Sequence, residues 1–337
     1  MKSRKVIIYD KEDVRIIEED LGELKDGSCL IENEYSLISA GTELSRIFKL
    51  KEGAEYPVYP GYCAVFTVLE SRNPEIKAGD RVLYSGTHCS VSNYDPAKGD
   101  GGLLFKLKKE TDPRLAPYMS MCWIAMNSFL PAEVKLGDIV AIFGLGTLGI
   151  ISALYYQQMG TRVICFEPSK TRAMQAEICG VKEIISCTPE KQVEEFRRIT
   201  GSADADITVD ASGISACIET AIKITGNYGQ VVLLGSPRVA MQDNVSVPFY
   251  AIHSKNLKVI GALNRLYPFD PVMGTRRNKK RYLGLIEDMI NNGTLPVEKL
   301  ISHEIVPDEE ELLKSYRGLM YDKDKYTGVI INWKKTK

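Results

Sequence analysis

The stretch Ile139–Leu154, IVAIFGLGTLGIISAL, decides the fold. A short apolar strand leads into three glycines with the spacing G-x-G-x-x-G, and an apolar helical pattern follows. The first glycine permits a tight turn, the second lets the backbone approach a pyrophosphate, and the third allows close contact between helix and strand. The N–H groups that open the helix favour an anion. We therefore expect a dinucleotide to contact this turn, at Gly144, Gly146, Thr147, Leu148 and Gly149.

Short strands and helices alternate around this stretch, from Asp138 to Leu263. Alternation of this kind predicts an α/β fold with a doubly wound parallel sheet covered by helices on both faces. The first third of the chain instead contains short β-branched runs bounded by Gly, Asp or Pro, which predicts a β-rich domain. Two helices and one strand are predicted after Leu263. They cannot bury themselves alone, so we expect them to return to the first domain.

An acidic residue stands at the end of the second predicted strand. Glu167 closes the apolar segment RVICFE, 23 positions after Gly144. A carboxylate there can accept both hydroxyls of an adenosine ribose and would repel a 2′-phosphate, which favours NAD over NADP. Lys170 and Arg172 follow closely and leave NADP open. The remaining expected cofactor contacts are Ser212, Gly235 and Asn264.

Composition excludes several classes of partner. The 337 residues include 43 Lys plus Arg and 44 Asp plus Glu, so a net charge of −1 gives no reason to expect nucleic acid or an anionic membrane. No apolar run approaches the roughly 20 residues that span a bilayer, and the N-terminus does not resemble a signal peptide. The eight cysteines form no C-x-x-C pair, which predicts reduced thiols in a cytoplasmic protein.

Four motifs resemble one family over nearly the whole chain. They are AGTE at Ala40–Glu43, AGDRVLYSG at Ala78–Gly86, VKLGDIVAIFGLGTLG at Val134–Gly149 and VDASG at Val209–Gly213. Together they resemble the medium-chain dehydrogenase/reductase superfamily of alcohol-dehydrogenase-like enzymes. The SAGTE variant resembles a branch with bacteriochlorophyllide dehydrogenase-like and sugar or cyclitol oxidoreductases. The resemblance implies a GroES-like catalytic domain in residues 1–121, a Rossmann domain in 122–265, a return to the catalytic domain in 266–337, and a homodimer or homotetramer.

The resemblance also shows what is missing. Zinc members carry a ligand cysteine where this chain has Ala40, a His-Glu pair where it has Tyr62 and Cys63, and a third ligand near Ser120. Zinc needs three or four converging Cys, His or carboxylate ligands. The segment that would hold structural zinc contains one cysteine. We therefore expect no zinc and no metal ligand. The alternative is a divergent metal site that uses Cys63, His88 and Cys89.

Without zinc, side chains must supply the proton and stabilise the oxyanion. The resemblance places Tyr62 where a zinc ligand would face the nicotinamide. Its phenol can exchange a proton if its pKa is lowered from about 10; alternatively the ring only packs at the domain interface. Thr42 matches the hydroxyl that relays the substrate proton, or it caps the turn. Ser45, three residues later, could pass a proton outward.

Other polar residues have two interpretations each. His88 follows a strand that borders the substrate cleft in the family, so its imidazole could act as acid or base, or make a local hydrogen bond. Glu43 is expected to orient its turn through Arg46. A basic run at a helix start either binds a phosphate or carboxylate of the substrate or is a solvated face. The run comprises Arg276, Arg277, Lys279, Lys280 and Arg281.

The sequence thus predicts a zinc-independent oxidoreductase that transfers a hydride between NAD(P) and a secondary alcohol or ketone. The branch resemblance suggests a small sugar- or cyclitol-like substrate. One alternative is an NADPH-dependent quinone or enoyl reductase, against which Glu167 argues. The other is a non-catalytic nucleotide-binding sensor or structural protein that keeps the fold.

Overall fold

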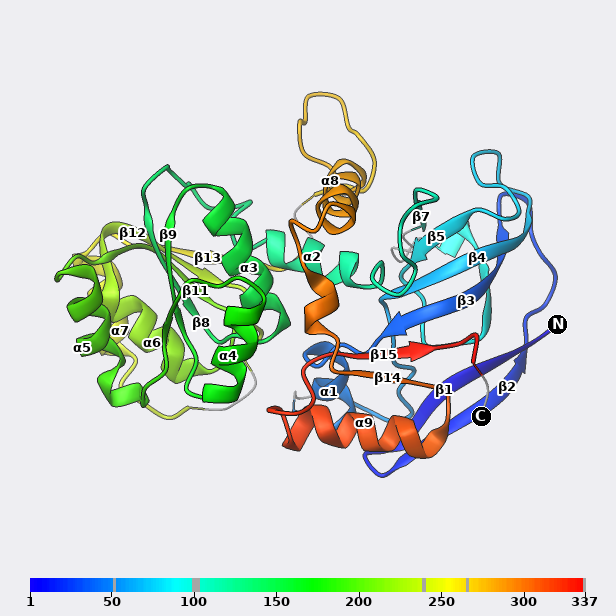
Figure 1. The fold of residues 1–337 in the computed structure, drawn as a ribbon, viewed down its shortest axis with the longest axis horizontal. Coiled ribbons are helices and arrows are strands. Elements are labelled where there is room, and N and C mark those ends of the chain that lie inside the picture. The colour runs from blue at the N-terminus through cyan, green and yellow to red at the C-terminus, as the bar shows by residue number, and fades with distance from the viewer. Residues whose placement is uncertain (51–52, 99–103, 238–240, 265–266, 336–337) are drawn as a thin grey trace. The chain divides into compact units, whose positions relative to one another are not determined.

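The computed structural model describes residues 1–50, 53–98, 104–237, 241–264 and 267–335, in two compact units (Figure 1). Unit 1 combines Met1–Met121 with Tyr267–Lys337, so the C-terminal segment belongs with the N-terminal one. Unit 2 is Cys122–Leu266. Helix α2 (Tyr118–Met126) contains the first boundary, and the expected boundary between residues 265 and 266 lies outside the described residues.

Unit 2 contains a six-stranded parallel sheet in the order β10-β9-β8-β11-β12-β13. The chain moves outward from β8 in one direction and then from β11 in the other. The carboxyl ends of β8 and β11 therefore form the switch point, where doubly wound folds bind ligands. This confirms the predicted α/β fold class. The strands are β8 (Ile139–Phe143), β9 (Arg162–Phe166), β10 (Glu183–Ile185), β11 (Ala205–Asp210), β12 (Thr225–Leu233) and β13 (Lys258–Gly261).

Helices connect these strands and cover the sheet (Figure 1). The core on one face includes the stacked rings of Phe143 and Phe166, whose centroids are 4.4 Å apart. Gly160 and Gly180, both with positive φ, follow the C-cap residues of α3 and α4, as the sequence predicts. The helices are α3 (Thr147–Gln158), α4 (Lys170–Ile178), α5 (Pro189–Thr200), α6 (Ser215–Ile224) and α7 (Ser246–Ser254).

Unit 1 is β-rich. Its larger sheet has the order β14-β15-β3-β4-β5-β7, with β6 also paired to β3, and β1 and β2 form a hairpin. The strands are β1 (Lys2–Asp10), β2 (Asp13–Asp20), β3 (Cys29–Leu37), β4 (Ala64–Ser71), β5 (Arg81–Tyr84), β6 (Val91–Tyr94), β7 (Leu104–Lys106), β14 (His303–Ile305) and β15 (Val329–Asn332). Its helices are α1 (Thr42–Ile47), α8 (Lys279–Asn291) and α9 (Glu309–Tyr321), with short 3-10 turns at Pro96–Lys98 and Val297–Leu300.

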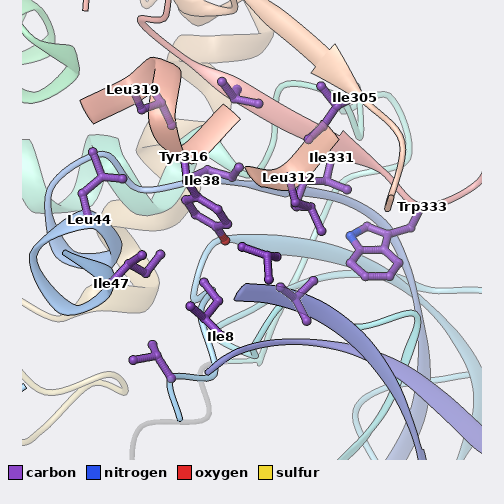
Figure 2. Packing of buried hydrophobic residues seen from close by; sticks show 14 residues of the cluster. Ile8, Ile38, Leu44, Ile47, Ile305, Leu312, Tyr316, Leu319, Ile331 and Trp333 are labelled. Carbon is purple, nitrogen blue, oxygen red and sulfur yellow. The ribbon is translucent and has the colours of Figure 1, made fainter. Parts of the chain in front are cut away.

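The two ends of the chain share one hydrophobic core in unit 1 (Figure 2). Ile8 and Leu44 come from the N-terminal segment, whereas Leu312, Tyr316 and Trp333 come from the C-terminal one. All are at least nine-tenths buried. Helix α9 and the C-terminal strands thus bury their apolar face against residues of β1 and α1, which explains why this part of the chain returns to unit 1.

None of the described helices has the length and apolar character needed to span a membrane. All eight cysteines are free thiols, and six of them are buried. Buried thiols of this kind act as small apolar core groups.

Candidate active site

The glycine turn in unit 2 has two positions that only glycine fits. Gly144 follows β8 with φ +89°, in the left-handed region. A Cβ on Gly149 would overlap the carbonyl oxygen of Gly144. At Gly146 the situation differs, because φ is −77° and a Cβ added there would meet no atom within 4 Å. The turn therefore leaves open space above Gly146, and contact with a cofactor there remains a prediction.

A second loop lies against this turn at the switch point. The buried Asp210 carboxylate accepts hydrogen bonds from the Ser212 N–H (3.0 Å), the Ser212 hydroxyl (2.6 Å) and the Gly213 N–H. Ser212 packs against Gly144, and a Cβ on Gly235 would overlap Gly213. The structure thus brings three residues that are predicted to contact the cofactor to one edge of the sheet: Gly144, Ser212 and Gly235. Of the other predicted contacts, Thr147 and Leu148 open α3, and Asn264 lies half-buried three residues after β13.

Glu167 is already bound by its own protein. The side chain is buried and accepts hydrogen bonds from the Leu145 N–H (3.0 Å) and the Ser169 N–H (3.1 Å). The Arg172 guanidinium also donates to it, at 2.6 Å. The expectation that this carboxylate simply awaits a ribose is therefore incomplete. It also fastens the glycine turn to the end of β9, and it holds a positive charge beside the expected ribose position.

Tyr62 in unit 1 lies in a cluster of hydroxyl groups. Its phenol oxygen is 2.6 Å from Ser39 Oγ and is also hydrogen-bonded by Thr42. Burial raises the pKa of Tyr62, assisted by Cys63, and the two hydroxyl partners only partly oppose that rise. The condition named above for proton exchange, a lowered pKa, is therefore not met within the protein alone. At neutral pH the phenol is a protonated donor.

Thr42 and Ser45 differ from their expected geometry. Thr42 is the first residue of α1, where Gly41 is the N-cap residue and no side-chain cap forms. The Thr42 side chain is exposed, whereas Ser45 is buried and donates to the Thr42 carbonyl at 2.9 Å. The Thr42 hydroxyl therefore does not cap the turn, and it lowers the pKa of Tyr62, in the direction opposite to burial. The expected outward proton path does not run through Ser45.

Cys63 is fully buried beside Tyr62. Burial raises the pKa of its thiol, as does the charge of Glu43, while a hydrogen bond with Ser120 and the charge of Lys279 lower it. Lys279 is the first residue of α8 and is half-buried, and burial lowers its pKa. The sequence does not single out this inward lysine. Lys279 is marked in the sequence only as one member of the basic run, and the run does not reveal which of its side chains is partly buried.

His88 is enclosed in unit 1. It is fully buried, with Nε2 3.0 Å from Glu43 Oε2 and Nδ1 2.8 Å from Ser36 Oγ. Glu43 also accepts the Ser39 N–H, whereas the expected partner Arg46 is exposed. Both ring nitrogens of His88 are therefore occupied by protein groups. The geometry agrees with the alternative of a local hydrogen bond and offers no nitrogen to a substrate.

The residues at the zinc positions do not fit zinc. Ala40, Tyr62, Cys63 and Ser120 together offer one thiol, which is already hydrogen-bonded to a serine. Within the described ranges, no group of three or more His, Cys, Asp or Glu could hold a metal ion. A divergent site that uses His88 would require one of its ring nitrogens to give up its present hydrogen bond to Ser36 or Glu43.

Comparisons with known proteins agree with this fold. The family described as "Zinc-binding dehydrogenase" matches residues 145–273, which excludes all four zinc positions of unit 1. Sorbitol dehydrogenase from Bombyx mori is 20% identical over 338 residues, covering 88% of this chain and 90% of that protein. The 2-desacetyl-2-hydroxyethyl bacteriochlorophyllide A dehydrogenase from Cereibacter sphaeroides is 24% identical, with full coverage of both chains.

A solved structure extends the agreement to three dimensions. Galactitol-1-phosphate dehydrogenase from Escherichia coli superposes with a TM-score of 0.81 at 17% identity, covering 99% of this chain and 100% of that chain. The likeness in fold, the matched family and the relatives along the whole length agree with the motifs that flank the glycine turn. The comparisons therefore support membership in the medium-chain dehydrogenase/reductase superfamily of alcohol-dehydrogenase-like, NAD(P)-dependent oxidoreductases.

Proposed function

We propose that this protein interconverts a secondary alcohol and a ketone on a sugar- or cyclitol-like molecule, without zinc. One observation supports the proposal: the phenol of Tyr62, which the family resemblance assigns to a zinc-ligand position, is hydrogen-bonded to Ser39 within unit 1. The substrate class is supported by relatives named for polyols, sorbitol and galactitol 1-phosphate. A side-chain acid replaces the Lewis acid in this scheme.

The proton chemistry follows from the phenol's environment. When bound, the nicotinamide supplies or accepts the hydride. In the direction of ketone reduction, Tyr62 donates its proton to the carbonyl oxygen as that oxygen becomes a hydroxyl, and the phenolate is then reprotonated from solvent. Ser39 and Thr42 hold the phenol oxygen in place. The phenol is protonated at neutral pH, so the donor form needed for reduction is present, but burial raises its pKa, so proton transfer requires the charge that develops on the reacting oxygen to draw the proton away.

Lys279 completes the electrostatics of the proposed site. Its half-buried ammonium lies close enough to Cys63, the direct neighbour of Tyr62, for the lysine charge to lower the pKa of that thiol. A positive charge at this position stabilises the negative charge that develops on the reacting oxygen and on the phenolate. The neighbouring basic residues are engaged elsewhere: Arg277 with Tyr267, and Lys280 with Asp270.

The cofactor assignment rests on Glu167 and its neighbour. The carboxylate supports NAD, since it can still accept a ribose hydroxyl through unused lone pairs and would repel a 2′-phosphate. Arg172 supports the second candidate, an NADPH-dependent quinone or enoyl reductase, because its guanidinium lies beside the carboxylate. We propose NAD as the preferred cofactor.

Turnover and metal content test the proposal together. The protein purified without chelator is assayed on polyols, ketones, quinones and enoyl compounds with each cofactor, and its zinc is quantified. We expect NADH-dependent ketone reduction, less than about one-tenth equivalent of zinc, and no loss of activity with EDTA. Strict NADPH use on conjugated double bonds would establish the second candidate. Tight NADH binding without turnover on any compound would indicate a sensor.

We also propose a homodimer or homotetramer in a reducing, cytoplasmic compartment. The edge strand β13 pairs only with β12 in the described sheet, and α7, which precedes it in the chain, has no buried residue. Phe249 and Tyr250 of α7 and Val259 of β13 are exposed apolar side chains, and each element offers a place for a second copy to pack. The free thiols support the compartment. Light scattering of the native protein and of a Val259→Lys variant tests the assembly, which we expect the lysine to weaken.

A further inference from the structure

We propose that His88 is a positioning residue for Tyr62, because it joins the turn that carries Ser39 to the turn that carries Tyr62. The inference rests on the proposed function, in which the phenol donates the proton. It assigns to His88 a role other than acid or base, since its ring reaches no substrate.

The first turn is closed by Glu43. One carboxylate oxygen accepts the Ser39 N–H at 2.8 Å, and the Glu43 N–H donates to the Ser39 carbonyl at 3.2 Å. These reciprocal bonds fix residues 39–43 as a unit. The other carboxylate oxygen, Oε2, faces His88 Nε2 at 3.0 Å. The imidazole therefore holds the whole turn through one charge-assisted contact.

The second turn rests on the backbone of His88. The His88 N–H donates to the Pro60 carbonyl at 2.8 Å. Gly61 follows with φ +107°, and a Cβ there would overlap the His88 backbone and approach the ring. Gly61 therefore needs both its conformation and its missing side chain to pack on His88. This packing sets the direction in which Tyr62 leaves the turn.

The ring itself is fixed from its far side by the C-terminal segment. Trp333 Nε1 donates to Ser36 Oγ at 2.9 Å, so the Ser36 hydroxyl proton is available for His88 Nδ1 at 2.8 Å. That assignment leaves the proton on Nε2, pointing at Glu43. Tyr316 donates to the same carboxylate oxygen at 3.3 Å. Figure 2 shows Tyr316 and Trp333 within the shared core of unit 1.

This arrangement makes the 2.6 Å contact between Ser39 and Tyr62 depend on His88. Each partner of that contact lies on a different turn, and His88 binds both turns from inside the protein. A misplacement of about 1 Å in a reacting group can lower a rate by up to about 10²-fold. Loss of the imidazole should therefore lower turnover while cofactor binding, which unit 2 provides, is retained.

The test uses a double-mutant cycle with His88→Ala, Tyr62→Phe and both together. We expect His88→Ala to lower kcat about 10- to 100-fold with little change in the Kd for NADH, and to have no further effect in the Tyr62→Phe background. His88→Gln, which keeps an amide donor for Glu43, should recover part of the rate. His303→Gln is the matched control, because that half-buried histidine stacks on Tyr326 in the same unit and should leave kcat unchanged.

Hydrogen exchange of the same variants gives a readout that is independent of turnover. In His88→Ala we expect faster amide exchange in residues 36–47 and in 58–66, and unchanged exchange in the described part of unit 2. Multiplicative kinetic losses in the cycle, or unchanged exchange in both turns, would overturn the positioning role. If the native protein shows no turnover at all, the proposed function fails, and the exchange data alone decide whether His88 joins the two turns.

Discussion

Two glycine turns, one in each unit, differ in how closely their residues match the superfamily motifs that the sequence resembles. The turn at Gly144–Gly149 keeps all three glycines, and its constraints are backbone overlaps. The turn at Gly61 keeps its glycine, but Tyr62 and Cys63 follow where zinc relatives have ligands. The backbone of a functional turn can thus persist while the chemistry it presents is replaced. Substitutions in each turn test the two sides of that contrast.

The largest effect is expected at Gly149. Gly149→Ala places a methyl group on the carbonyl oxygen of Gly144, so the turn must open or α3 must shift. We expect NADH affinity to fall by more than about 100-fold and the melting temperature to drop by several degrees. Fluorescence titration and thermal unfolding measure the two effects.

Gly146→Ala is the matched control for that change. Its φ of −77° suits alanine, and no atom lies within 4 Å of the added methyl position. We expect an unchanged melting temperature with weaker NADH binding, because the methyl would occupy the predicted path of the pyrophosphate. Unchanged binding in Gly146→Ala would show that the cofactor does not approach this position.

The second prediction concerns the replaced chemistry in unit 1. Tyr62→Phe removes the phenol oxygen but keeps the ring, so turnover should fall about 10²-fold or more while NADH affinity stays the same. Steady-state kinetics with direct NADH titration separate the two quantities. If kcat is retained, Tyr62 serves packing, and the contrast between the turns loses its catalytic meaning.

The third prediction probes Glu167. Glu167→Gln removes the negative charge but keeps an acceptor for the Leu145 N–H, and it leaves Arg172 without its ionic partner. We expect the preference for NADH over NADPH to fall by roughly 10-fold or more, because the free energy of one charge-assisted hydrogen bond corresponds to a factor of that size. Competitive binding of the two cofactors measures this ratio of affinities. The double variant Glu167→Gln/Arg172→Met should lose the gain in NADPH affinity.

The features that the backbone determines can be predicted well from the sequence. The spacing of Gly144, Gly146 and Gly149 after an apolar run suffices to predict the strand, turn and helix, because each glycine answers a local steric demand. The return of the C-terminal segment follows from its unburied apolar face. Contacts between distant residues did not follow from the sequence: the partners of His88 lie 45 and 52 positions away. The inward turn of Lys279 likewise depends on how α8 packs.

The fourth prediction compares two adjacent lysines of α8. Lys279 is half-buried near Cys63, whereas Lys280 is exposed and pairs with Asp270 at 3.7 Å. Lys279→Met should lower kcat roughly 10-fold, because one electrostatic stabiliser of the reacting oxygen is lost. Lys280→Met is the control and should leave kcat unchanged. Equal effects of the two variants would point to general charge rather than to the position of Lys279.

The smallest expected effect is a loss of stability at alkaline pH. Burial raises the pKa of Cys89 and of Cys122 to about 12, and it also raises the pKa of Tyr62 and Cys63. In the unfolded chain thiols ionise near about 8.5 and phenols near about 10, so unfolding releases protons above these values. Stability from these groups is therefore complete below about pH 8.5 and is lost as pH rises, by at most about 1.4 kcal/mol per pH unit for each group.

Thermal unfolding between about pH 7 and about pH 10.5 under reducing conditions measures this loss. We expect a constant melting temperature to about pH 8.5 and a decline above it. Cys63→Ala removes one of these groups next to Tyr62 and should make the decline shallower. A matched change outside the core, Cys187→Ala, removes a thiol that is only half-buried and should alter the slope less. Equal slopes in both variants would mean that Cys63 contributes no more to the pH dependence of stability than Cys187 does.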